Sequence, residues 1–189
     1  MKKKAYYIIL ENHVLLSKKL YSDWRQIQDE YKDYKSSLEP LNEEELIDYF
    51  ANDYKNTSDY PISLDRIKEF YNSEEFILYE NGQLQKSDFQ PITPWFIENN
   101  NTTQSNLFKE LQKEIHEEHY LFKKEFCIIG RRSDQDDVAL FLNKDNAIAF
   151  VHMTWKGKKE QGIWPVTKIL LNKKELDSQL EYDKIEYGE

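Results

Sequence analysis

The chain has 189 residues and a net charge of −9, from 26 basic and 35 acidic side chains. With 39% hydrophobic and 14% aromatic residues it is not typical of a disordered or low-complexity chain. The negative charge disfavours general binding to phosphate backbones, so we expect no direct contact with nucleic acid. No apolar run approaches the length of a membrane span, so we expect no membrane contact either.

The sequence favours a cytoplasmic protein without a cofactor or a metal. Its single cysteine, Cys127, cannot form an internal disulfide. The apolar run over residues 5–10 is too short for the hydrophobic region of a secretory signal. We find no paired CxxC, no glycine-rich phosphate loop and no Gly-x-Ser-x-Gly elbow.

In the first half, two apolar runs over residues 5–10 and 14–16 flank a polar turn and predict a β-hairpin. Trp24, Ile27, Tyr31 and Tyr34 recur at helical spacing and predict a helix over 21–36. Further helices are predicted over 43–55, after a cap at Asn42, and after Ser63. A strand over 76–79 then precedes Asn81-Gly82, which is typical of a hairpin turn.

In the second half, Pro91, Pro94 and the polar run 99–103 predict a boundary between an acidic, tyrosine-rich region, 1–98, and a second module, 99–189. One continuous domain is the alternative. The second module should contain a helix from Thr103 or Ser105, strands over 126–130, 138–142, 147–155 and 166–171, and a helix over 173–182. The predicted fold class is therefore α+β, with a helix-rich N-terminal half carrying β-hairpins and an antiparallel sheet of about four strands in the C-terminal half.

Acidic residues and tyrosines share one region. Residues 21–80 hold six basic and sixteen acidic side chains, and ten of the 13 tyrosines lie in residues 1–80. Tyrosine offers a large contact area at a low entropic cost, and carboxylates steer a basic partner. The first hypothesis is therefore an immunity protein or antitoxin that neutralises a basic toxin domain. The candidate contacts are Tyr31, Tyr34, Glu43, Glu44, Glu45, Tyr49 and Tyr54.

Two other interpretations of the acidic region stay open. The tyrosines can belong to the core while the acids only solvate the helices. Alternatively, carboxylates on the helices over 21–36 and 43–55 can imitate the phosphates of a nucleic acid, which would make the protein an acidic inhibitor.

An enzyme is a further alternative. Strand alternation places His152 on one face with Phe150 and Thr154, where His152 could act as a general base. Its candidate partners are Arg131, Asp136 and Asp137, and a hydrolase or a metal-dependent nuclease would be the first class to test. The alternative for His152 is a core histidine with a polar partner.

Two smaller patterns are ambiguous. His116 and His119 lie three residues apart rather than the four of a zinc-protease helix, so a solvated helix end is favoured. Trp155 and Trp164 bracket a basic loop, which could clamp an aromatic or anionic ligand or could simply be anchored to the sheet.

Residues 115–168 resemble a family of small uncharacterised bacterial proteins. The likeness rests on the patterns Arg-Arg-x-Asp-x-Asp-Asp-Val from residue 131, Val-His-x-Thr-Trp-x-Gly-Lys-x-Glu from residue 151 and Trp-Pro-x-Thr from residue 164. The resemblance implies a bacterial origin and a discrete C-terminal module, without a known activity. Its motif positions are Arg131, Asp136, Asp137, His152, Thr154, Trp155 and Trp164.

Overall fold

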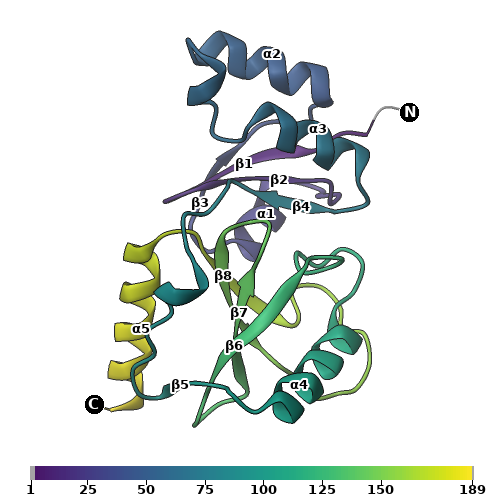
Figure 1. Cartoon of the computed structure of the whole chain (residues 1–189). Coiled ribbons are helices and arrows are strands. Elements are labelled where there is room, and N and C mark those ends of the chain that lie inside the picture. The colour runs from purple at the N-terminus through teal and green to yellow at the C-terminus, as the bar shows by residue number, and fades with distance from the viewer. Residues whose placement is uncertain (1–2, 189) are drawn as a thin grey trace. The chain divides into compact units, whose positions relative to one another are not determined.

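The structure, a computed structural model, describes residues 3–188 (Figure 1). The chain forms two compact units that divide between Glu80 and Asn81. Residues 81–98, which precede the boundary expected from the sequence, belong to the second unit.

The first unit contains a four-stranded antiparallel sheet in the order β3-β1-β2-β4. Its strands are β1 (Tyr6–Leu10), β2 (Val14–Ser17), β3 (Tyr34–Ser37) and β4 (Ile77–Tyr79). The predicted hairpin over residues 5–16 is confirmed, since β1 and β2 pair with Tyr7 opposite Leu16.

Helices α2 (Glu43–Asp53) and α3 (Leu64–Asn72) cover one face of this sheet (Figure 1). Between them lies a short 3₁₀ turn, η1 (Thr57–Asp59). The Asn42 cap predicted for α2 is confirmed, because its side chain accepts hydrogen bonds from the backbone of Glu44 and Glu45 while Glu45 reaches back to Asn42. The shared core is aromatic and aliphatic and consists of Ala5, Tyr7, Leu16, Leu46, Phe50, Ile62, Ile67, Phe70, Tyr71 and Leu78.

The helix predicted over 21–36 is wrong in its second half. Helix α1 spans only Trp24–Glu30 and ends at Tyr31, whose backbone is extended. Residues 34–37 instead form edge strand β3, in which Ser36 and Ser37 lie opposite Ile9 and Ile8 of β1. Tyrosine and serine are only moderate helix formers, so pairing with an existing strand outweighs the helical spacing of the apolar residues.

The second unit is built on a five-stranded antiparallel sheet in the order β5-β6-β7-β8-β9. Its strands are β5 (Trp95–Ile97), β6 (Phe126–Arg132), β7 (Asp137–Leu142), β8 (Ala147–His152) and β9 (Val166–Leu170). A 3₁₀ turn, η2 (Lys86–Asp88), precedes them. Helices α4 (Asn101–Glu114) and α5 (Lys173–Tyr187) lie on opposite sides of the sheet (Figure 1).

These two sheets correct the predicted distribution of secondary structure. The chain is α+β, but the helices are not concentrated in its N-terminal half, which holds a sheet of its own. The second sheet has five strands rather than about four. The additional strands β3 and β5 are short and lie at sheet edges, where polar residues and nearby prolines are tolerated and leave little periodicity in the sequence.

Asn81-Gly82 does not form the predicted hairpin turn. Gly82 lies against the β7–β8 turn instead, and its backbone N–H donates to the carbonyl of Asp145 at 2.8 Å. A Cβ atom at this position would lie 2.2 Å from the carbonyl oxygen of Asn146. The glycine is therefore needed for close approach of two backbones rather than for a turn.

Candidate functional site

Most of the tyrosines proposed as contacts pack into the first unit. Tyr31 is buried, and burial raises the pKa of its phenol well above the usual value. Tyr49 and Tyr54 pack against the core of α2 and α3, and their rings lie 6.0 Å and 5.9 Å from that of Phe50. Tyr34 is half-buried, and its hydroxyl lies 3.0 Å from that of Ser37. These phenols serve mainly as packing.

The acidic side chains of the same region lie outside. Glu44 and Glu45 are exposed and Glu43 is half-buried, although Glu45 is also engaged in the cap of α2. A depression of about 360 Å³ lies beside the start of α2. It is lined by Lys3, Asn42, Glu43, Glu44, Tyr71 and Asn72.

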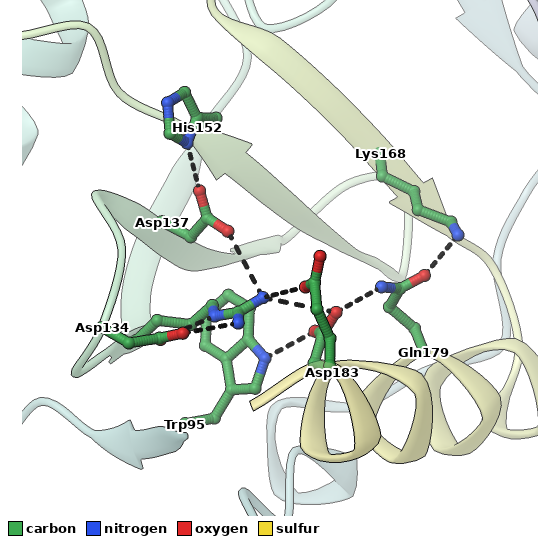
Figure 2. A network of polar contacts seen from close by, with 9 residues as sticks. Trp95, Asp134, Asp137, His152, Lys168, Gln179 and Asp183 are labelled. Carbon is green, nitrogen blue, oxygen red and sulfur yellow. Dashed lines mark hydrogen bonds and ion pairs between the residues drawn. The ribbon is translucent and has the colours of Figure 1, made fainter. Parts of the chain in front are cut away.

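In the second unit, a buried arginine organises a network of polar residues (Figure 2). Arg132 has a side chain that is 3% exposed, and it binds Asp134 with two hydrogen bonds of 2.9 and 2.8 Å. Its guanidinium also lies 3.5 Å from Asp183 of α5 and 3.9 Å from Asp137 of β7. The indole N–H of Trp95 donates to Asp183 at 2.7 Å.

His152 is the exposed end of this network. Its Nδ1 lies 2.6 Å from the Asp137 carboxylate, and 43% of its side chain is exposed. Burial raises the pKa of Asp137, and the hydrogen bond to His152 only partly offsets that shift. The Trp164 ring lies 6.1 Å from the imidazole, centroid to centroid. An imidazole oriented by a carboxylate can act as a base, but within residues 3–188 none of the contacts of His152 supplies a nucleophile.

Of the neighbours predicted for His152, Asp137 is confirmed, whereas Arg131 and Asp136 are wrong. A bulge between Ile128 and Gly130 shifts the alternation of β6, so Arg132 rather than Arg131 shares a face with Asp137. Arg131 instead pairs with Glu98 at 3.0 Å. The Asp136 side chain is exposed, and only its backbone carbonyl contacts the histidine strand, where it accepts from Met153.

The loop over residues 153–165, here called the clamped loop, is fixed to the end of α4. Glu114 is fully buried, and its carboxylate accepts the backbone N–H groups of Thr154 at 3.0 Å and Trp155 at 2.6 Å. The Thr154 hydroxyl donates to Glu160 at 2.6 Å, and the Glu160 N–H donates to the Glu114 carbonyl at 2.9 Å. Lys156 pairs with Glu160 at 2.9 Å.

The two histidines after α4 hold the other end of the clamped loop. The Nε2 of His116 lies 3.1 Å from the Gly162 carbonyl, and that of His119 lies 2.9 Å from the Pro165 carbonyl. A carbonyl only accepts, so both Nε2 atoms carry the proton and donate. Across residues 3–188, no group of three or more histidine, cysteine, aspartate or glutamate side chains is arranged to hold a metal ion.

The clamped loop and the start of β9 expose apolar side chains. Trp155 is 50% exposed, Ile163 49%, Trp164 40% and Val166 39%. Trp155 has a φ of +56°, in the left-handed region that bulky residues rarely adopt. Glu114 holds the N–H group of Trp155 itself and that of the preceding Thr154, and these bonds stabilise the unusual backbone.

The residues that fix both arrangements were not identified from the sequence. Arg132 and Asp183 belong to one network, and Glu114 anchors the clamped loop. Glu114 lies in a run of charged residues that resembles a solvated helix end. Only its spacing of three positions from the buried Leu111 indicates that it lies on the inner face of the helix.

No family model, curated protein or solved structure matches this chain. Within residues 3–188, none of the helices has both the length and the apolar character needed to cross a membrane.

Proposed function

We propose that the protein is a non-catalytic, cytoplasmic binding protein that engages a basic protein partner through the carboxylates of α2 and α3, as an immunity protein or antitoxin would. The supporting observation is the separation of side chains in the first unit, where the phenols pack inward and the carboxylates point outward. Asp48 of α2 and Asp65 and Glu69 of α3 are exposed. They add to the charge of Glu43 and Glu44, which line the depression beside α2.

Because the phenols pack inward, the proposed contact surface consists of the carboxylates alone, and the proposed role stays the same. Carboxylates on a surface speed association with a basic partner even when they add little final affinity. The depression is lined by two carboxylates, Glu43 and Glu44, and by one amine, Lys3, so it keeps a net negative charge that suits a lysine or arginine side chain of such a partner. Tyr49 and Tyr54 then support this surface from below instead of touching the partner, and the buried Tyr31 takes no part in it.

The experiment uses the product of the gene next to that of this protein as the first partner to test. Binding is measured at low and at physiological salt for the wild type and for Asp48→Lys/Glu69→Lys. We expect the association rate constant of this variant to fall at least tenfold at low salt and to lose most of its salt dependence. In cells that produce the partner, co-expression of this variant should no longer protect growth as the wild type does.

A matched variant, Glu117→Lys/Glu118→Lys, changes the net charge equally but alters two exposed acids of the second unit. It should bind like the wild type. Equal decreases in the association rate constant for both variants would mean that net charge alone causes the effect. An acidic partner, or binding that is unchanged in both variants, would overturn the proposal.

A second candidate function is hydrolysis, favoured by the 2.6 Å contact between His152 and Asp137 at the protein surface. Hydrolysis of ester and phosphodiester substrates that disappears in His152→Gln, with partner binding unchanged, would support it. Equal hydrolysis by the variant would exclude His152 as the base.

A further inference from the structure

The clamped loop is built to hold a fixed shape. Burying a carboxylate costs free energy unless its oxygens accept hydrogen bonds. Both oxygens of Glu114 accept hydrogen bonds from the backbone N–H groups of residues 154 and 155. Glu160, which is 9% exposed, binds Thr154 and Lys156. Helix α4 and the loop are thus joined by charge-assisted hydrogen bonds, which are stronger than bonds between neutral groups and fix the shape of the loop.

This fixed loop and Val166, the first residue of β9, expose apolar side chains to solvent. Trp155, Ile163, Trp164 and Val166 are each between 39% and 50% exposed. Large exposed apolar groups on one segment mark interaction surfaces, and tryptophan is the residue most enriched where binding energy concentrates. A preformed loop also avoids the entropic cost of ordering when it binds.

The charges of the loop are basic. Lys158 and Lys159 are exposed, and neither forms an ion pair with any residue of the described chain. The only carboxylate within the loop is Glu160, which binds Thr154 and Lys156 and also feels the charge of Lys158 from beyond ion-pair distance. The loop keeps an excess of positive charge, and tryptophans beside exposed lysines complement a segment that carries both carboxylates and apolar side chains.

We infer that the clamped loop is a docking surface for an acidic peptide segment of a partner protein, in which aspartate or glutamate flanks aromatic or aliphatic residues. Its apolar side chains contact Trp155 and Trp164, and its carboxylates pair with Lys158 and Lys159. The aliphatic Ile163 and Val166 favour a protein segment over a stack of bases. This surface is separate from the carboxylates of α2 and α3 and binds a ligand of opposite charge.

The test selects binders to the whole protein from a displayed library of random 12-residue peptides. Sequences that also bind Trp155→Ala/Trp164→Ala are removed. We expect the remaining peptides to be enriched in acidic and apolar residues. Synthetic copies should bind Lys158→Glu/Lys159→Glu at least tenfold more weakly than the wild type.

Two matched variants make the result specific. Lys109→Glu/Lys174→Glu changes two exposed lysines of the same unit, and Trp24→Ala removes a tryptophan that is 49% exposed in the first unit. Both should bind the selected peptides like the wild type. Circular dichroism and amide exchange of α4 show whether each loop variant keeps its fold.

Several outcomes would overturn the inference. They are a library without loop-dependent binders, selected peptides that are basic, and unchanged binding by Lys158→Glu/Lys159→Glu. Binding of a twelve-nucleotide thymidine strand in place of the peptides, or a loop-dependent dimer in sedimentation, would assign the surface to another occupant. None of these results depends on whether the carboxylates of α2 and α3 bind a basic partner, so the two proposals fail separately.

Discussion

The two units treat charge in opposite ways. In the first unit, among the described residues, Ser17 is the only buried polar side chain apart from the buried tyrosines, and the core is aliphatic and aromatic. The second unit buries a set of charged and polar side chains, namely Glu98, Glu114, His119, Arg132, Asp145, Glu160 and Asp183. Buried charge is costly without partners, so its positions are tied to specific geometry, whereas exposed acids can vary without affecting the fold.

The comparison predicts that the largest loss of stability follows removal of the central buried cation. Arg132→Met leaves the carboxylates of Asp134, Asp137 and Asp183 without their shared partner, and we expect a loss of about 4 kcal/mol in the free energy of unfolding of the second unit. Urea unfolding followed by the fluorescence of the buried Trp95 measures it.

A double variant distinguishes this cause from lost packing. If uncompensated charge is responsible, Asp183→Asn in the Arg132→Met background should restore part of the lost stability, although Asp183→Asn alone destabilises the wild type through Trp95 and Gln179. Strict additivity of the two losses would contradict the electrostatic explanation.

The next largest effect should come from Glu114→Gln. The amide retains one acceptor oxygen, so one of the N–H groups of Thr154 and Trp155 loses its partner, at a cost of about 3 kcal/mol. Hydrogen exchange at these two amides should accelerate about a hundredfold. Glu125→Gln changes an exposed carboxylate of the same unit that pairs with Lys144, and it should leave both amides protected.

A smaller effect is expected in the pH dependence of the second unit. Burial raises the pKa of Asp137 in the folded protein, so the folded state binds this proton more tightly than the unfolded chain. The contribution of Asp137 to stability therefore decreases as the pH rises from the ordinary aspartate value, about 3.9, through its raised value.

Asp137→Asn removes this titration. The stability of the variant relative to the wild type should consequently increase over that interval and level off above it. Urea unfolding at half-unit steps between pH 3 and 8 measures the difference. A difference that falls with increasing pH would mean that His152 and Arg132 outweigh burial in setting the pKa of Asp137.

The sequence predicted the strands of the second unit well because apolar alternation is strong over residues 126–171. Five strands and their order still required the structure, since β5 has three residues and follows Pro94. The sequence named Asp137 among the candidate partners of His152, and this pairing is confirmed. The contact of Arg132 with Asp137 could not be predicted, because a single bulge in β6 exchanges the faces on which Arg131 and Arg132 lie.

For the tyrosines of the first unit, the sequence did not predict which side chains are buried. A composition that combines acids and phenols does not reveal which side of a helix each residue takes, and the spacing of Tyr49 and Tyr54 with Phe50 fits a core face as well as a contact face. The structure places their rings in one aromatic cluster with Tyr7 and Tyr60. Charge could thus be predicted from sequence, but the accessibility of the neutral aromatic residues could not.

The smallest effect compares two helix caps within the first unit. Asn42 accepts hydrogen bonds from the backbone of Glu44 and Glu45, whereas Ser63, at the same position of α3, makes no side-chain bond to its helix. Asn42→Ala should cost about 1 kcal/mol, and Ser63→Ala should cost much less because no hydrogen bond is lost. Hydrogen exchange in the first turns of α2 and α3 measures both. An equal cost at the two positions would mean that intrinsic preference for the cap conformation, rather than the bond itself, stabilises these helices, and the exposed acids at the start of α2 would then account for the order of its first turn through the helix dipole alone.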